Sequence, residues 1–203
     1  DFIKVYEEHG LAGVHHPTNA DPVADGCGWP IGASVTIPED WLSGGYVIVF
    51  IGEHHGQQVT QDGFFVLRAA DPGTRSRLAL VLATYSWQEY NDWGGGCGYF
   101  SDEFVDLSGD PLKIREQSFR PRMSFHRPWS RGMIRVPVGV PRLAQPRTPF
   151  GAAASTPAAE WCVANGHSVW TIANGWPRYD GLTARWLEAE GYEPELLSQW
   201  DLD

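Results

Sequence analysis

The chain has 203 residues, of which 42% are hydrophobic and 20% charged, so it can bury a core and is not a disordered polypeptide. Its formal net charge of −10 disfavours a general nucleic-acid-binding protein, which needs a basic surface. No apolar run approaches the ~18 residues of a membrane-spanning helix. We therefore expect a protein that binds neither nucleic acid nor a membrane.

The cysteines indicate the redox environment. There are three, Cys27, Cys97 and Cys162, and they are widely spaced. Such an odd, sparse set argues against a disulfide framework and predicts a reducing, cytoplasmic compartment. No Cys-x-x-Cys pair occurs, which disfavours a structural zinc site. The first residue is Asp1 rather than Met and no signal peptide is evident, so we expect a processed or truncated product.

Residues 1–74 have the pattern of a mainly β, sandwich-like domain. Segments 31–37, 46–51 and 63–68 predict strands, because they contain β-branched and aromatic residues and are separated by turn-forming residues. This arrangement is typical of an antiparallel sheet or a small sandwich. The sequence Asp71-Pro-Gly-Thr74 predicts a turn and a domain boundary.

Residues 75–203 have the different pattern of an α/β domain. The run 78–83 is apolar throughout, as are parallel strands that are covered on both faces. A long Pro-rich loop is predicted at 136–157. A short helix at 158–164 and a strand at 168–172 are expected to follow it.

The last segment predicts a helix followed by a strand. Apolar residues recur at helical spacing, namely Leu182, Trp186 and Leu187. Asp180 is the expected N-cap and Gly191 the expected C-terminal stop. A strand at 193–197 follows, and the order strand, helix, strand predicts a parallel sheet.

The segment Ser86–Gly96 is the strongest candidate for a functional site. It reads Ser-Trp-Gln-Glu-Tyr-Asn-Asp-Trp-Gly-Gly-Gly and directly follows the apolar run 78–83. Ligand sites of open α/β sheets collect just past the carboxyl ends of strands. The alternative is a glycine-rich turn with aromatic residues packed beneath it.

Other residues have simpler explanations. Adjacent histidines at 15–16 and 54–55 would point to opposite faces of a strand and are poor candidates for one metal ion. Cys97 resembles a nucleophile on a tight turn, but no paired His is evident. Arg127 precedes a proline, and we expect it to lock its loop rather than to pair with a carboxylate. For the cluster as a whole, Arg115, Arg120, Arg122, Arg127, Arg131 and Arg135, we favour ion pairs with the surplus of acidic residues.

Six motifs occur in one order from Gly26 to the end of the chain. They are Gly26-Cys-Gly-Trp-Pro30, Pro38-Glu-Asp-Trp-Leu-Ser-Gly-Gly-Tyr46, Trp87-Gln-Glu-Tyr-Asn-Asp-Trp-Gly-Gly95, Met123-Ser-Phe-His-Arg-Pro-Trp129, Arg185-Trp-Leu-Glu-Ala-Glu-Gly-Tyr192 and Asp201-Leu-Asp203. This order resembles the C-terminal part of the large subunit of N,N-dimethylformamidase and its relatives. The resemblance implies a β-sandwich-like part and an α/β domain with a glutamine-amidotransferase-like parallel sheet. In a chain this short, an oligomer or a further segment would have to complete that sheet.

The same resemblance implies a metal site. The characterised member is an amidohydrolase with a mononuclear ferric ion, Fe(III), held by two tyrosinates and one glutamate. By position in the motifs, Tyr46 and Tyr90 match the tyrosine ligands. Asp203 stands where the family has a His, and the position of the family's glutamate falls beyond it. A ferric ion would polarise the amide carbonyl and activate water, with Asn91 orienting substrate or water and Asp203 accepting a proton.

The expected activity is metal-dependent hydrolysis of a small amide, such as N,N-dimethylformamide, to a carboxylate and an amine. The resemblance also implies a small second subunit, and exposed strand edges would favour an oligomer. One alternative is a non-catalytic binding or assembly scaffold of the same fold. Another is a cysteine amidohydrolase centred on Cys97.

Overall fold

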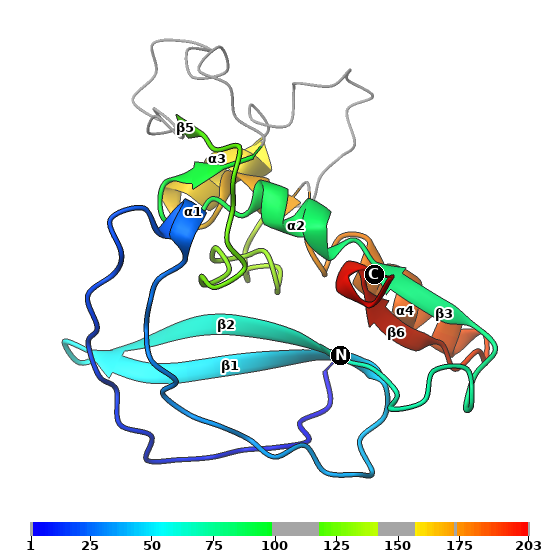
Figure 1. Ribbon diagram of the computed structural model, residues 1–203. Coiled ribbons are helices and arrows are strands. Elements are labelled where there is room, and N and C mark those ends of the chain that lie inside the picture. Colours follow the sequence, from blue (N-terminus) through cyan, green and yellow to red (C-terminus); the bar gives the residue numbers. More distant parts are fainter. Residues whose placement is uncertain (1, 99–117, 142–156, 173, 203) are drawn as a thin grey trace.

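The computed structural model describes four stretches of the chain: residues 2–98, 118–141, 157–172 and 174–202. They form a mixed α/β fold (Figure 1) with, within these stretches, one antiparallel and two parallel two-stranded sheets. A short helix, α1 (Pro22–Asp25), precedes the sheets. Three parts of the prediction lie outside the described residues, namely Arg115, residues 142–156 of the Pro-rich loop and Asp203.

A long hairpin dominates the first part of the chain. Strands β1 (Gly44–His54) and β2 (Gln57–Leu67) pair antiparallel along their whole length. They are joined by His55 and Gly56, which both have positive φ, as tight hairpin turns of this type require. The strands predicted at 46–51 and 63–68 are therefore confirmed. The strand predicted at 31–37 is wrong, because these residues form an exposed extended segment with no strand partner.

The two faces of the hairpin contact different parts of the molecule. Phe64 packs against Trp87 and Trp176, and Gly45 on the same face lies so close to Trp176 that a Cβ would clash. Tyr46 and its cross-strand partner Phe65 point the other way, because side chains alternate along a strand. The hairpin thus has the Trp87 layer on one face and the stack of Trp41, Tyr46 and Phe65 on the other.

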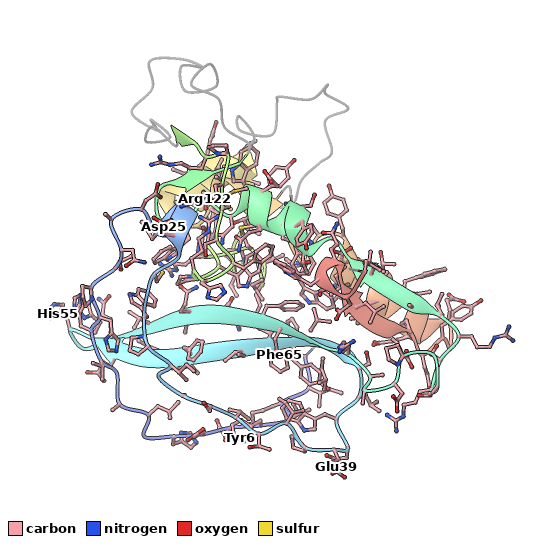
Figure 2. All side chains as sticks on the ribbon, viewed as in Figure 1. Tyr6, Asp25, Glu39, His55, Phe65 and Arg122 are labelled. Carbon is pink, nitrogen blue, oxygen red and sulfur yellow. The ribbon has the colours of Figure 1, made fainter. Side chains whose placement is uncertain are left out.

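The parts of the N-terminal segment around Tyr6 and Glu39 lie on the side of the hairpin away from α2 (Figure 2), whereas α1 lies on the α2 side (Figure 1), where Val23 O accepts a hydrogen bond from Ser124 N. This segment has no strand or helix besides α1, and most of its side chains are exposed. The same figure shows His55 at the tip of the hairpin. The predicted boundary at residue 74 stays a prediction, although the hairpin packs directly onto residues of the second part.

A parallel pair is present as predicted, and so is the strand near 193–197, but its partner is the strand near 78–83 and not the one predicted at 168–172. Strands β3 (Ala79–Leu82) and β6 (Glu195–Ser198) are parallel, with Ala79 opposite Glu195 and Leu82 opposite Ser198. Leu82 and Leu196 are buried, whereas Val81 is 37% exposed. The strand is therefore covered on one face rather than on both.

Helix α2 (Thr84–Tyr90) begins two residues after β3. The sequence prediction treated this segment as a loop, but four buried residues recur at helical spacing: Thr84, Trp87, Gln88 and Asn91. The glycine-rich segment that follows leads into β4 (Gly96–Cys97), which pairs parallel with β5 (Ser118–Phe119). The helix thus ends at its C-cap Asn91, and the glycines belong to the turn and strand that follow it.

A second core lies around two short helical elements. Helix α3 (Pro157–Ala164) confirms the predicted helix, and it packs with the 3-10 helix η3 (Val169–Ile172). The strand predicted at 168–172 is wrong. Ser168 O accepts hydrogen bonds from the backbone and hydroxyl of Thr171, and this local pairing closes a turn instead of extending the chain.

Helix α4 (Asp180–Ala189) is present as predicted, but its buried face is not the apolar stripe. Leu182 and Trp186 are mostly exposed, and the buried residues are Gly181 and Ala184. Their small size lets Trp176 pack against the helix, since a Cβ on Gly181 would come within 2.8 Å of its ring. In the stretches described, no helix combines the length and apolar character needed to cross a membrane.

The predicted C-terminal stop of α4 is confirmed, whereas its predicted N-cap is wrong. Gly191 has a φ of +84° and follows the helix, as expected for a C-terminal stop. Asp180 is the first helical residue rather than the N-cap, which is Tyr179. After β6 the described chain ends in the 3-10 helix η4 (Gln199–Leu202).

Candidate functional site

The candidate site surrounds α2, next to the carboxyl ends of β3 and β6. The Gln199 side chain ties the two strand ends together, because its Oε1 accepts a hydrogen bond from Tyr85 N at 2.7 Å. The backbone N–H of Gln199 lies 3.4 Å from the hydroxyl of Thr84. The carboxyl ends of β3 and β6 therefore meet at one edge of the sheet, which is where ligand sites of α/β proteins collect.

Asn91 is completely buried directly after α2. Its Nδ2 donates to Gln88 Oε1 at 2.8 Å and to Pro128 O at 3.0 Å. Its Oδ1 accepts from the backbone and hydroxyl of Ser130, each at 3.0 Å, and from Trp93 N at 3.3 Å. Both amide donors and the acceptor are thus used inside the protein, and the side chain joins α2 to the loop around Pro128.

Arg127 is buried beside this network. Its Nη1 donates to Trp93 O at 2.7 Å and to Gly96 O at 3.3 Å, and its Nη2 donates to Gln88 O at 3.3 Å. Its Nε donates to Ser124 O at 3.2 Å. All these acceptors are neutral carbonyl oxygens, which confirms that Arg127 locks the loop. Burial lowers the pKa of the guanidinium from its ordinary value.

We call Gln88, Asn91, Arg127 and Ser130 the Arg127 hub. Each of the four is at least 92% buried. The hub holds the segment after α2 in a turn in which Gly94 and Gly95 adopt positive φ of 88° and 89°. Other arginines of the predicted cluster do form ion pairs with acidic residues, namely Arg120 with Asp21, Arg122 with Asp25 (Figure 2) and Arg135 with Asp62.

Tyr90 ends α2 and faces the second core. Its ring packs edge-on against Trp170, with 5.0 Å between the ring centroids. The cluster also contains the buried side chains of Cys97 and Cys162. Cys97 is completely buried, so a substrate has no direct access to its thiol.

Tyr46 lies in a different environment. Its ring is stacked between those of Trp41 and Phe65, with centroid separations of 4.9 and 5.2 Å. Its hydroxyl donates a hydrogen bond to Leu42 O at 2.8 Å. Burial, together with the negative charge of Asp40, raises the pKa of the phenol.

The two tyrosines are not brought together in this arrangement. Tyr46 lies on the hairpin face that points away from the Trp87 layer, whereas Tyr90 belongs to the α2 side. The described residues therefore do not fit a ferric site with both phenols as ligands. Among them, no group of three or more His, Cys, Asp or Glu residues is arranged to hold a metal ion. Asp203 lies outside the described residues.

Sequence reasoning missed two members of the hub and one anchoring carboxylate. Gln88 and Asn91 are three residues apart, which is the spacing of neighbours on a helix and could have indicated that they pair. Ser130 gave no signal, because it meets Asn91 only through tertiary structure. Glu195, at the start of β6, accepts hydrogen bonds from the backbone of the 73–76 turn.

Comparison with known proteins identifies the family of the chain. No curated protein and no solved structure matches the chain. The family model described as "N,N-dimethylformamidase beta subunit-like, C-terminal" matches residues 4–203, which is nearly the whole chain. The resemblance seen in the six motifs is confirmed, and the chain belongs to the N,N-dimethylformamidase beta subunit-like family.

Proposed function

We propose that the chain is part of a protein that hydrolyses a small amide, such as N,N-dimethylformamide, to a carboxylate and an amine. In this reaction the oxygen of water forms a bond to the carbonyl carbon and the C–N bond breaks. One proton of the water goes to the leaving nitrogen. The observation that carries the proposal is the family match over residues 4–203.

The geometry supports a role for the Arg127 hub in this reaction. The hub contains Asn91 and fixes the residues that flank Tyr90. It lies at a sheet edge where ligand sites of α/β proteins collect. Since the hydrogen bonds of Asn91 are all internal, we propose that it positions this loop rather than binding the substrate. We also propose that an oligomer or a further segment completes an amidotransferase-like sheet around β3 and β6. A second subunit is part of the same proposal.

Metal dependence stays a prediction from the resemblance. We retain Tyr90 as a candidate iron ligand, and Tyr46 would join it only if its stack with Trp41 and Phe65 opened. We assign no catalytic step to a metal. Asp203 stays a candidate proton acceptor by its position in the closing motif.

The proposal is tested by incubating the purified chain with N,N-dimethylformamide and measuring formate and dimethylamine by NMR. The same sample is loaded with ferric iron and its metal content and visible absorption are measured. Product formation, together with tyrosinate-to-iron absorption that Tyr90→Phe abolishes, would support both parts. Turnover without bound iron would support the proposed hydrolysis and contradict its dependence on iron.

A non-catalytic scaffold is the second candidate function. It is favoured by the fact that Asn91 and Tyr46 both make hydrogen bonds within the protein. No turnover and no bound iron, from a chain with native circular dichroism, would establish it over the enzyme.

A further inference from the structure

Three aromatic side chains from three separate segments meet at the carboxyl edge of the β3–β6 pair. Tyr85 comes from α2, Phe125 from the loop before Arg127 and Trp200 from η4. The ring centroids are 5.6 Å apart for Tyr85 and Phe125, 5.2 Å for Tyr85 and Trp200, and 5.2 Å for Phe125 and Trp200. All three pairs are edge-to-face, so each ring is held by two others.

The cluster is fixed at its base and open at its surface. Tyr85 N–H donates to Gln199 Oε1 at 2.7 Å, and this bond holds the start of α2 beside the residue preceding Trp200. Trp200 is nevertheless 57% exposed. A large ring that is rigidly held and open to solvent offers apolar contact area at little cost in side-chain entropy.

The position of the cluster connects it with the Arg127 hub. Tyr85 and Tyr90 lie at opposite ends of α2, about 7–8 Å apart along the helix axis at ~1.5 Å per residue. Phe125 is two residues before Arg127 in the same loop. A small molecule bound on the rings would therefore lie close to the loop that the hub holds in place.

The polar groups beside the rings are already occupied. The carboxylate of Asp201 accepts from the backbone and hydroxyl of Ser198, both at 2.8 Å, and lies 3.5 Å from Arg68 Nε. Gln199 Oε1 is used by Tyr85 N. Apart from the Tyr85 hydroxyl, the three rings offer aromatic rather than polar surface, which suits the alkyl groups of a ligand.

We propose that Tyr85, Phe125 and Trp200 form a platform that binds the N-alkyl groups of the amide and selects tertiary amides over primary ones. This inference rests on the proposed function. The methyl groups of N,N-dimethylformamide carry partial positive charge and pack against the negative ring faces. A primary amide has no N-alkyl group to make this contact, so it lacks the apolar contribution to binding.

The experiment measures binding separately from turnover. Saturation-transfer NMR is recorded on the intact chain with N,N-dimethylformamide, and with formamide as the comparison ligand. We expect saturation of the N-methyl protons in the wild type and a several-fold weaker signal in Trp200→Leu. The matched control is Trp186→Leu, which removes an equally exposed tryptophan from α4, 58% against 57%, and leaves the cluster intact.

A Trp200→Leu signal equal to that of the wild type would overturn the platform, and so would the absence of any N-methyl signal in the wild type. Phe125→Leu is a second platform variant, and it should weaken the N-methyl signal as Trp200→Leu does. Thermal melting confirms that each variant is folded. Where turnover is present, Trp200→Leu should lower the ratio of kcat/KM for N,N-dimethylformamide to that for formamide about tenfold, as loss of an apolar contact does. Binding without turnover would support the platform and contradict the proposed hydrolysis. Turnover with the same kcat/KM ratio in Trp200→Leu as in the wild type would support the hydrolysis and contradict the platform.

Discussion

The two ends of the β3–β6 pair each carry a carboxylate bound to backbone amides, and the two carboxylates have opposite shifts in pKa. At the amino end, Glu195 accepts from Gly73 N at 2.7 Å and from Arg75 N and Ser76 N at 3.3 Å. These bonds, above all the one from Gly73, lower the pKa of Glu195. At the carboxyl end, Asp180 accepts from Ala83 N at 3.1 Å, and burial raises its pKa despite this bond.

The comparison shows that the hydrogen bonds from backbone donors, set against burial, decide the direction of the pKa shift. It also bears on where a ligand binds. A cavity of about 440 Å³ lies at the amino end, beside Gly73 and Glu195. The carboxylate there already has three backbone donors, which close the turn onto β6. We therefore regard the amino end as an anchor and the carboxyl end, with the hub and the platform, as the functional end.

The largest effect is expected at the carboxyl end, from Arg127→Met. This change removes five hydrogen bonds and leaves buried carbonyl oxygens without donors. We expect a loss on the order of 3–5 kcal/mol in the free energy of unfolding, because bonds to a charged donor contribute ~1.5–3 kcal/mol each and are not additive. The measurement is urea unfolding followed by far-UV circular dichroism.

The control for this prediction is Arg122→Met, which breaks an exposed ion pair with Asp25. Such pairs contribute about 0–1 kcal/mol, so this variant should unfold nearly as the wild type does. If both variants lost the same small amount, the hub would not be the element that holds the functional end together.

The sequence was sufficient for the elements whose pattern is local. The hairpin, β3, α3 and β6 were predicted from strand composition, apolar runs and turn residues. The inward face of α4 was not predictable in this way. It is set by Trp176, which needs the small residues Gly181 and Ala184 and leaves Trp186 outside.

In the candidate site, too, local sequence patterns predicted some roles, and contacts between distant residues set the others. The locking role of Arg127 followed from the proline after it, and structure confirms it. The hydrogen bonds of Asn91 to Pro128 and Ser130 join residues 37 and 39 positions apart, and no spacing rule indicates them. The face on which Tyr46 lies depends on strand register, because a shift of one residue would turn its side chain to the α2 side.

The second prediction concerns the amino end and uses Glu195→Gln. Because the pKa of Glu195 is lower in the folded chain than its ordinary 4.5, its contribution to stability is present above that value and is lost as the pH falls through the folded pKa. Gln keeps one acceptor oxygen and removes the charge. We expect a lower melting temperature at pH 7 and a smaller difference between pH 7 and pH 3 than in the wild type. Equal pH dependence in the two proteins would show that Glu195 is not the anchor.

The smallest effect, and the opposite sign, is expected for Asp180→Asn. The pKa of Asp180 is raised above its ordinary 3.8 in the folded chain, so the stability linked to this group is present below that value and is lost as the pH rises through the folded pKa. Asn keeps an acceptor for Ala83 N and removes the charge that burial opposes. Since solvent screens this half-buried group, we expect a gain of less than about 1 kcal/mol at pH 7 and none at pH 3.

Thermal melts of the wild type, Asp180→Asn and Glu195→Gln at both pH values test the comparison directly. The difference between each variant and the wild type should have opposite signs at pH 7 and should shrink at pH 3 for both. Destabilisation by both changes at pH 7 would mean that the charged form of Asp180 is needed at the functional end. That result would mark Asp180, which also accepts a hydrogen bond from Trp87 next to the hub, as a residue with a role beyond packing.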